Sequence, residues 1–164
     1  MVDPLVVTAL LDDRSQARFD ALRQEHFPPS RNHVAAHLTL FHALPGEQVV
    51  AVEQALRDSV VSSYDGVVAG VRSLGRGVAY DVHCPELVSL HAGLRRRFAG
   101  WLTAQDTQGL RPHVTVANKV PPTVARSLLE SLSSSFAPWP VTVRGLGLWW
   151  YRGGPWELVA EVVP

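Results

Sequence analysis

Two short stretches of the 164-residue chain decide its fold, His37-Leu38-Thr39-Leu40 and His113-Val114-Thr115-Val116. Each consists of a histidine, an aliphatic residue, a threonine and an aliphatic residue, and they begin 113 − 37 = 76 positions apart. Successive side chains of a β-strand point to opposite faces. On each strand the histidine and the threonine therefore share one face, and the two aliphatic residues share the other. Each stretch predicts a strand that buries an apolar face and presents an imidazole beside a hydroxyl.

The segments around these two stretches repeat one order of strands and helices. Short apolar runs that end at turn residues predict strands, and apolar residues spaced three or four positions apart predict helices. The first half is expected to run strand, helix, strand, helix, strand, and the second half to run the same way with one more strand. The predicted strands are Leu5–Leu11, Val34–Leu44, Val67–Leu74, Val78–Cys84, Pro112–Lys119, Val141–Tyr151 and Trp156–Val163, and the predicted helices are Asp13–His26, Glu47–Val61, Glu86 to about Leu102, and Pro121-Pro122 to about Phe136.

This repetition predicts an internal duplication at about half the chain length. We expect one bilobal domain over residues 1–164, with pseudo-repeats at approximately 1–75 and 76–164, because no linker separates the halves. Two copies related by approximate twofold symmetry would place two imidazoles and two hydroxyls around one cleft between the lobes.

Composition limits the classes of protein that remain. The chain has 15 Lys and Arg against 15 Asp and Glu, so its formal charge is zero, which argues against a protein that coats long nucleic acid. Hydrophobic residues make up 46% of the chain, enough to bury a core. No apolar stretch approaches the roughly 20 residues of a membrane span, and the amino terminus lacks the pattern of a signal peptide. We expect a cytoplasmic protein in which the single cysteine, Cys84, is a buried hydrophobe.

The paired histidines and threonines suit displacement at phosphorus. An imidazole titrates near pH 6.5, so one histidine can be the neutral base while the other is the charged acid. Threonine hydroxyls can donate hydrogen bonds to the non-bridging phosphoryl oxygens. The arrangement requires no metal or other cofactor, and the sequence offers neither a carboxylate cluster for magnesium nor a Cys/His set for zinc. It also lacks a phosphate-binding glycine loop ending in Gly-Lys-Ser/Thr.

The duplicated His-x-Thr-x motifs on this framework resemble the 2H phosphoesterase superfamily, in particular its 2'-5' RNA ligase-like (LigT-like) branch. The resemblance covers nearly the whole chain and includes Arg111-Pro112 before the second motif. It implies a bilobal α+β fold with two antiparallel sheets lining a central cleft and helices outside. It also implies hydrolysis of 2',3'-cyclic phosphates or 2'-5' phosphodiesters on nucleotides or RNA ends. Some members join RNA ends through a 2'-5' bond without ATP, so ligation stays open beside hydrolysis.

Carried onto this chain, the resemblance makes His37 and His113 the acid and the base, in an order that the sequence leaves open. Thr39 and Thr115 become the phosphate-binding hydroxyls. The substrate would be a nucleotide or an RNA terminus with a 2',3'-cyclic phosphate or a 2'-5' linkage, and no obligate protein partner is inferred.

Further residues are candidates for substrate binding by position alone. Phe41 is in phase with His37 and would line the cleft, whereas His42 is out of phase and is expected to be structural or at the surface. On the strand at Val141–Tyr151, Trp149 and Tyr151 share a face that suits base stacking. Four basic residues near strand ends or turns complete the set, namely Arg76, Arg111, Lys119 and Arg152. His33, in the loop before the first motif, is expected to be solvated.

Two other functions stay open from the sequence. A non-catalytic RNA- or nucleotide-binding module would use the same cleft, although binding alone needs no pair of titrating groups. A transition-metal site built on the two histidines lacks a third protein ligand at the motif positions.

Overall fold

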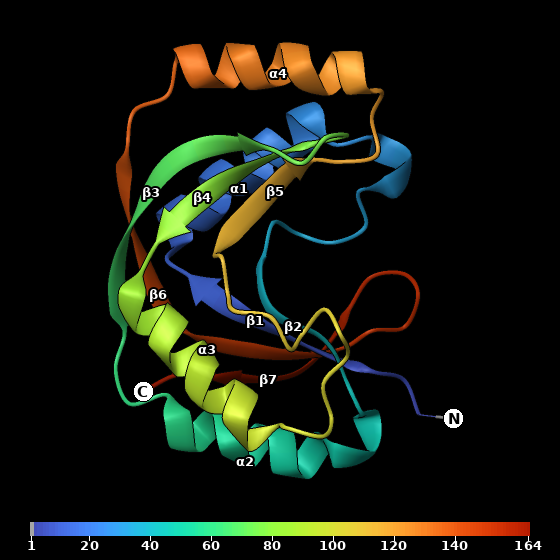
Figure 1. Cartoon of the computed structure of the whole chain (residues 1–164), viewed down its shortest axis with the longest axis vertical. Helices are drawn as coiled ribbons and strands as arrows, with labels where there is room; N and C mark the ends of the chain where they lie inside the picture. Colours follow the sequence, from blue (N-terminus) through green and yellow to red (C-terminus); the bar gives the residue numbers. More distant parts are fainter. Residues whose placement is uncertain (1) are drawn as a thin grey trace.

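The computed structural model describes residues 2–164, in which seven strands form a single antiparallel sheet with four α-helices packed around it (Figure 1). Two single-turn 3₁₀ helices, Pro29–Arg31 and Gly46–Gln48, lie in the connections. In chain order the main elements are β1 (Leu5–Leu11), α1 (Asp13–His26), β2 (Leu38–Leu44), α2 (Val49–Ser59), β3 (Tyr64–Ser73), β4 (Val78–His83), α3 (Pro85–Arg97), β5 (His113–Ala117), α4 (Pro122–Ser134), β6 (Trp139–Trp150) and β7 (Glu157–Val162). The predicted α+β class with antiparallel pairing is confirmed.

The long strand β6 joins the two parts of the sheet. The strand order is β2-β1-β6-β3-β4-β5, and β7 also pairs with β6. One edge of β6 pairs with β1, while the other pairs with β3 near its start and with β7 near its end. Strand β3, the third strand of the first half, therefore pairs with β4 of the second half. Strand β6, the third strand of the second half, pairs with β1 of the first half. The sheet curls so that its two outermost strands, β2 and β5, lie close together. The exact division into two pseudo-repeats stays a prediction.

The helices cover the outside of the curled sheet. Helix α1 packs against β5, and α4 packs against β3 and β4 at the upper end of Figure 1. Helices α2 and α3 pack against each other at the lower end. Between the sheet and the helices lies a core whose largest fully buried side chains include Phe19, Phe41 and Phe98. Every residue of β1 is buried, as its continuous apolar run predicts.

Local signals fix where the first helix begins. The carboxylate of Asp12 accepts the Ser15 N–H at 2.9 Å and so caps α1, which stabilises the helix by about 1 kcal/mol. Its second oxygen accepts the N–H of Thr142 at 2.8 Å and ties the start of α1 to β6. Pro85 and Pro122 occupy the first turns of α3 and α4, where a missing N–H costs nothing.

No helix among residues 2–164 is long and apolar enough to cross a membrane.

A β-bulge in the β1–β2 pair changes which side chains face the cleft. Thr8 pairs with Thr39, but the neighbouring Val7 pairs with Phe41, so the register shifts by one residue between them. Leu40 and Phe41 are consequently both buried, and His42 is exposed. The expected positions of Phe41 in the cleft and of His42 on the opposite face are therefore wrong, because strict alternation does not hold across a bulge.

Candidate functional site

The two motif histidines are held in the same way on β2 and β5, the outermost strands that the curl of the sheet brings together. His37 immediately precedes β2 and His113 is the first residue of β5. The Nδ1 atom of each ring lies 2.8 Å from the carbonyl oxygen two residues earlier, that of Ala35 for His37 and that of Arg111 for His113. Because a carbonyl oxygen can only accept, Nδ1 carries the proton and donates it. In each neutral ring, Nε2 is therefore the free nitrogen, available to take a proton.

Both histidines and both threonines of the motifs line one cavity of about 310 Å³, which we call the cleft. The structure thus brings together the four residues that the sequence predicted as the centre of the site. The imidazoles come from opposite ends of the strand order and face a shared space large enough for a phosphate group with part of its ester. The complete lining is Val6, His37, Thr39, His42, His113, Thr115, Tyr151 and Trp156.

Burial disfavours the charged form of both motif histidines. Burial lowers the pKa of His37 to about 4, while the hydrogen bond to Ala35 acts the other way. Burial also lowers the pKa of His113 from its ordinary value, opposed by its bond to Arg111 and assisted by the positive charge of Arg72. The His37 ring is therefore neutral at pH 7.

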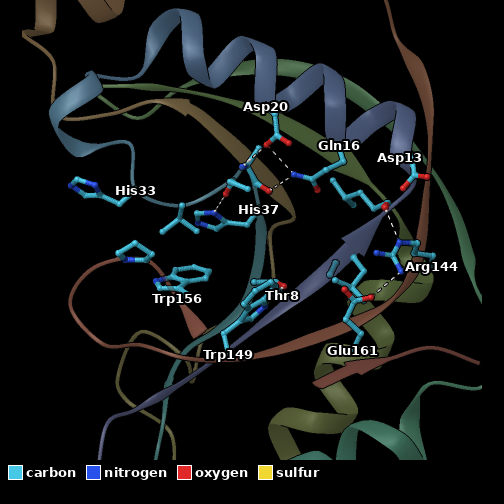
Figure 2. Close-up of a pocket in the computed structure, with 17 residues that line it drawn as sticks. Thr8, Asp13, Gln16, Asp20, His33, His37, Arg144, Trp149, Trp156 and Glu161 are labelled. Carbon is cyan, nitrogen blue, oxygen red and sulfur yellow. Dashed lines mark hydrogen bonds and ion pairs between the residues drawn. The ribbon is translucent and has the colours of Figure 1, made fainter. Parts of the chain in front are cut away.

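A second cavity, of about 320 Å³, adjoins the cleft, and Figure 2 shows the residues that line it. Val6 of β1 lines the cleft, and Thr8, Ala9, Leu10 and Leu11 of the same strand line the second cavity. His37 and Trp156 line both cavities and lie at their junction, with ring centroids 4.6 Å apart. Trp149 lies beneath, where its Nε1–H donates to the Thr8 hydroxyl at 2.9 Å.

Polar contacts from α1 hold the segment before His37 in place, above the second cavity in Figure 2. The Asp20 carboxylate accepts the N–H of Ala36 at 2.8 Å and the side-chain amide of Gln16 at 3.0 Å. The same amide donates to the Ala36 carbonyl at 2.8 Å. Because Ala36 precedes His37, these bonds fix the backbone that positions the imidazole.

Two of the aromatic candidates lie where the sequence placed them. Trp149 lines the second cavity and Tyr151 lines the cleft, so both lie beside the candidate site. His33, expected to be solvated, is exposed at the rim of the second cavity. Phe41 lies outside both cavities, because it is fully buried and stacked on His91.

The four basic candidates line neither cavity. Arg76 donates to the carbonyl of Val120, and Lys119 is exposed beyond the end of β5 remote from His113. The Arg111 side chain is exposed, and its contribution is the backbone carbonyl beneath His113. Arg152 is paired with Asp3 and Glu157 and lies over the Trp150 ring. Their contact with substrate stays a prediction, to which the lining of the two cavities adds no support.

Sequence reasoning missed three residues of the cleft lining, Val6, His42 and Trp156. His42 was assigned to the wrong face because of the bulge. Trp156 follows the Arg152–Pro155 turn, and nothing in the local pattern indicates that this turn folds back over His37. Among residues 2–164, no three His, Cys, Asp or Glu side chains are grouped in a way that could hold a metal ion.

Comparisons with known proteins agree with this geometry. The family model of the 2'-5' RNA ligase superfamily matches residues 11–155. The crystal structure of E. coli LigT with 3'-AMP has a TM-score of 0.69 at 17% identity, over 99% of this chain and 98% of that chain. TT0787 of Thermus thermophilus has a TM-score of 0.68 at 14% identity, over 98% and 97%. No curated protein matches the sequence. Sequence identities this low show a shared fold and no more. That shared fold confirms the LigT-like architecture expected from the motifs.

Proposed function

Because the chain belongs to the 2'-5' RNA ligase superfamily, we propose that it is a metal-independent phosphodiesterase acting in this cleft. Its substrates would be 2',3'-cyclic phosphates or 2'-5' phosphodiesters of nucleotides or RNA ends. The observation that carries the proposal is the pair of imidazoles, each with Nδ1 bonded to a carbonyl and each lining the same cavity beside a threonine.

The proposed reaction uses one histidine on each side of the phosphorus. One Nε2 takes a proton from the attacking water while a new P–O bond forms. The protonated Nε2 of the other histidine gives its proton to the leaving ribose oxygen as the old P–O bond breaks. The hydroxyls of Thr39 and Thr115 donate to the non-bridging oxygens, where negative charge is held in the transition state. With a nucleotide hydroxyl in place of water, the same groups would join ends through a 2'-5' bond.

The pKa values support one assignment of roles in the hydrolytic direction. The low pKa of His37, about 4, makes it the better candidate for the neutral base. Burial also lowers the pKa of His113, but the Asp81 carboxylate acts the other way and favours the charged form, so His113 is the better candidate for the acid. When a nucleotide hydroxyl takes the place of water, the same base and acid act, and in the reverse cleavage of the 2'-5' bond the two roles would exchange.

The second cavity supports a nucleotide as the substrate. It opens at His37 and is bordered by Trp149 and Trp156, aromatic side chains of the type that stack on bases. A phosphate in the cleft would thus have room for its nucleoside on the α1 side. LigT of E. coli, which has the same fold, has been crystallised with 3'-AMP, NADP+ and ATP. The cytoplasmic location stays a prediction.

A panel of substrates tests the proposal. The purified protein would be incubated, with EDTA present, with the four 2',3'-cyclic nucleotides and a 2'-5'-linked dinucleotide, and the products resolved by chromatography. We expect turnover to a nucleoside monophosphate, and the position of its phosphate identifies the leaving oxygen. Binding of these nucleotides without any turnover would contradict the proposal and favour the non-catalytic binding module.

A further inference from the structure

A buried carboxylate lies directly behind the third histidine of the cleft. The side chain of Asp106 is 1% exposed, and it accepts the Nδ1–H of His42 at 3.0 Å. It also accepts two backbone N–H groups, that of His42 at 2.9 Å and that of Ala43 at 3.0 Å. Burial would raise the pKa of Asp106, but these hydrogen bonds outweigh it and lower the pKa, so the group is an ionised carboxylate.

This bond orients the His42 ring toward the cleft. A carboxylate oxygen can only accept, so Nδ1 of His42 carries a proton and Nε2 is the atom left for another partner. The ring is 46% exposed and lines the same cavity as His37 and His113. The bulge after Thr39 is what brings it to this face.

The lining of the cleft carries no permanent positive charge, although Arg23 and Arg72 lie near enough to act on the two motif histidines. None of its eight lining residues is a lysine or an arginine, and His37 is held neutral by its low pKa. A phosphodiester brings a negative charge into this space. The titratable groups that face His42 are Asp106 from behind and His37, His113 and Tyr151 across the cleft. With Asp106 accepting from Nδ1 and a phosphate oxygen accepting from Nε2, both ring nitrogens of His42 would donate a hydrogen bond, each to an anion.

We propose that His42 binds a phosphoryl oxygen of the substrate through Nε2, and that Asp106 is the positioning residue that holds it there. This inference rests on the proposed function for the identity of the substrate, but the anion site itself does not. It gives the cleft a third histidine, which binds charge and leaves the proton transfers to His37 and His113.

The test compares His42→Gln and His42→Phe with His83→Gln, a control at an exposed histidine on β4 outside the cleft. The dissociation constant of inorganic phosphate would be measured by calorimetry at pH 6.5, and KM and kcat on any substrate found. Losing one charge-assisted hydrogen bond should raise the dissociation constant and KM about 10- to 100-fold, with a smaller change in kcat. Asp106→Asn should show part of this loss, and His83→Gln none.

A measurement on the wild-type protein tests the proposal even if the variants fail to fold. In a phosphate titration followed by imidazole ¹⁵N NMR, the Nε2 signal of His42 should shift with the same dissociation constant as calorimetry gives. An unmoved signal, or folded His42 variants that bind phosphate within twofold of wild type, would overturn the inference. Turnover that survives in those variants would refute the role of His42 and leave the proposed function standing. Phosphate binding through His42 without turnover of any cyclic nucleotide would refute the proposed function and keep the anion site.

Discussion

Removing the Asp106 carboxylate should destabilise the protein by an amount that follows from its contacts. Asp106→Ala leaves the backbone N–H groups of His42 and Ala43 without their acceptor. An orphaned buried donor costs about 1–3 kcal/mol, and water can reach the region beside the exposed His42 ring, so we expect a total loss of about 2–4 kcal/mol. For a domain of this size that loss lowers Tm by about 5–15 °C.

Urea unfolding at pH 7, followed by tryptophan fluorescence, measures this loss, and its pH dependence tests the cause. Because the pKa of Asp106 is lowered in the folded protein, its stabilisation is present above the unfolded-state pKa of 3.8 and is lost as pH falls through the folded value. The gap between wild type and variant should therefore be constant from neutral pH down to about pH 5 and then close.

Asp58→Ala serves as the matched control, because that carboxylate is exposed and pairs with Arg97 at the surface. Its unfolding midpoint should stay near that of wild type. If Asp106→Ala unfolds within about 0.5 kcal/mol of wild type at pH 7, the structural role given to this carboxylate is refuted.

Three other predictions concern the site and its frame. With the pKa of His37 lowered to about 4 and that of His113 lowered from its ordinary value, kcat/KM should be bell-shaped. It should rise as pH approaches about 4, level off, and fall about tenfold per pH unit once His113 loses its proton; a kcat/KM that still rises between pH 7 and 9 would contradict the roles. Gly77→Ala should lower Tm and activity together, because a Cβ there would lie 2.1 Å from the Ala117 carbonyl oxygen and force β4 away from β5. An unchanged Tm in a thermal scan would contradict this close approach of Gly77 to β5. Trp149→Phe removes the hydrogen bond to the buried Thr8 hydroxyl beneath the second cavity. It should lower the free energy of unfolding in urea by about 1 kcal/mol and raise nucleotide KM several-fold. An unchanged KM would exclude that cavity as the nucleoside site.

Elements determined by local signals were predictable from the sequence. The bounds of Leu5–Leu11 and Asp13–His26 agree residue for residue, because a continuous apolar run defines the strand and a capping aspartate begins the helix. The convergence of His37 and His113 was predictable because the same four-residue pattern occurs twice at a spacing of half the chain. The expected duplication is what predicts that the two histidines line one cavity, which neither strand specifies alone.

The parts that failed depend on contacts between distant segments. No local pattern shows the bulge after Thr39, which buries Phe41 and turns His42 into the cleft. Asp106 lies in a turn 64 residues from His42, so its carboxylate could not be assigned to the site from spacing. Arg152 was expected near substrate, but it pairs with Asp3 from the opposite end of the chain. In each case tertiary packing decides the position of a side chain whose own neighbours are uninformative.

The central claim is that two imidazoles facing one cleft catalyse phosphodiester chemistry without a metal. Its most direct test is the rate of 2',3'-cyclic AMP hydrolysis in EDTA by wild type, His37→Gln and His113→Gln, each checked for folding by circular dichroism. We predict chelator-insensitive turnover by wild type and a loss of about 10²- to 10⁴-fold in each variant. Hydrolysis that continues at the wild-type rate in either folded variant, or that stops in EDTA and returns with added metal, would contradict the claim.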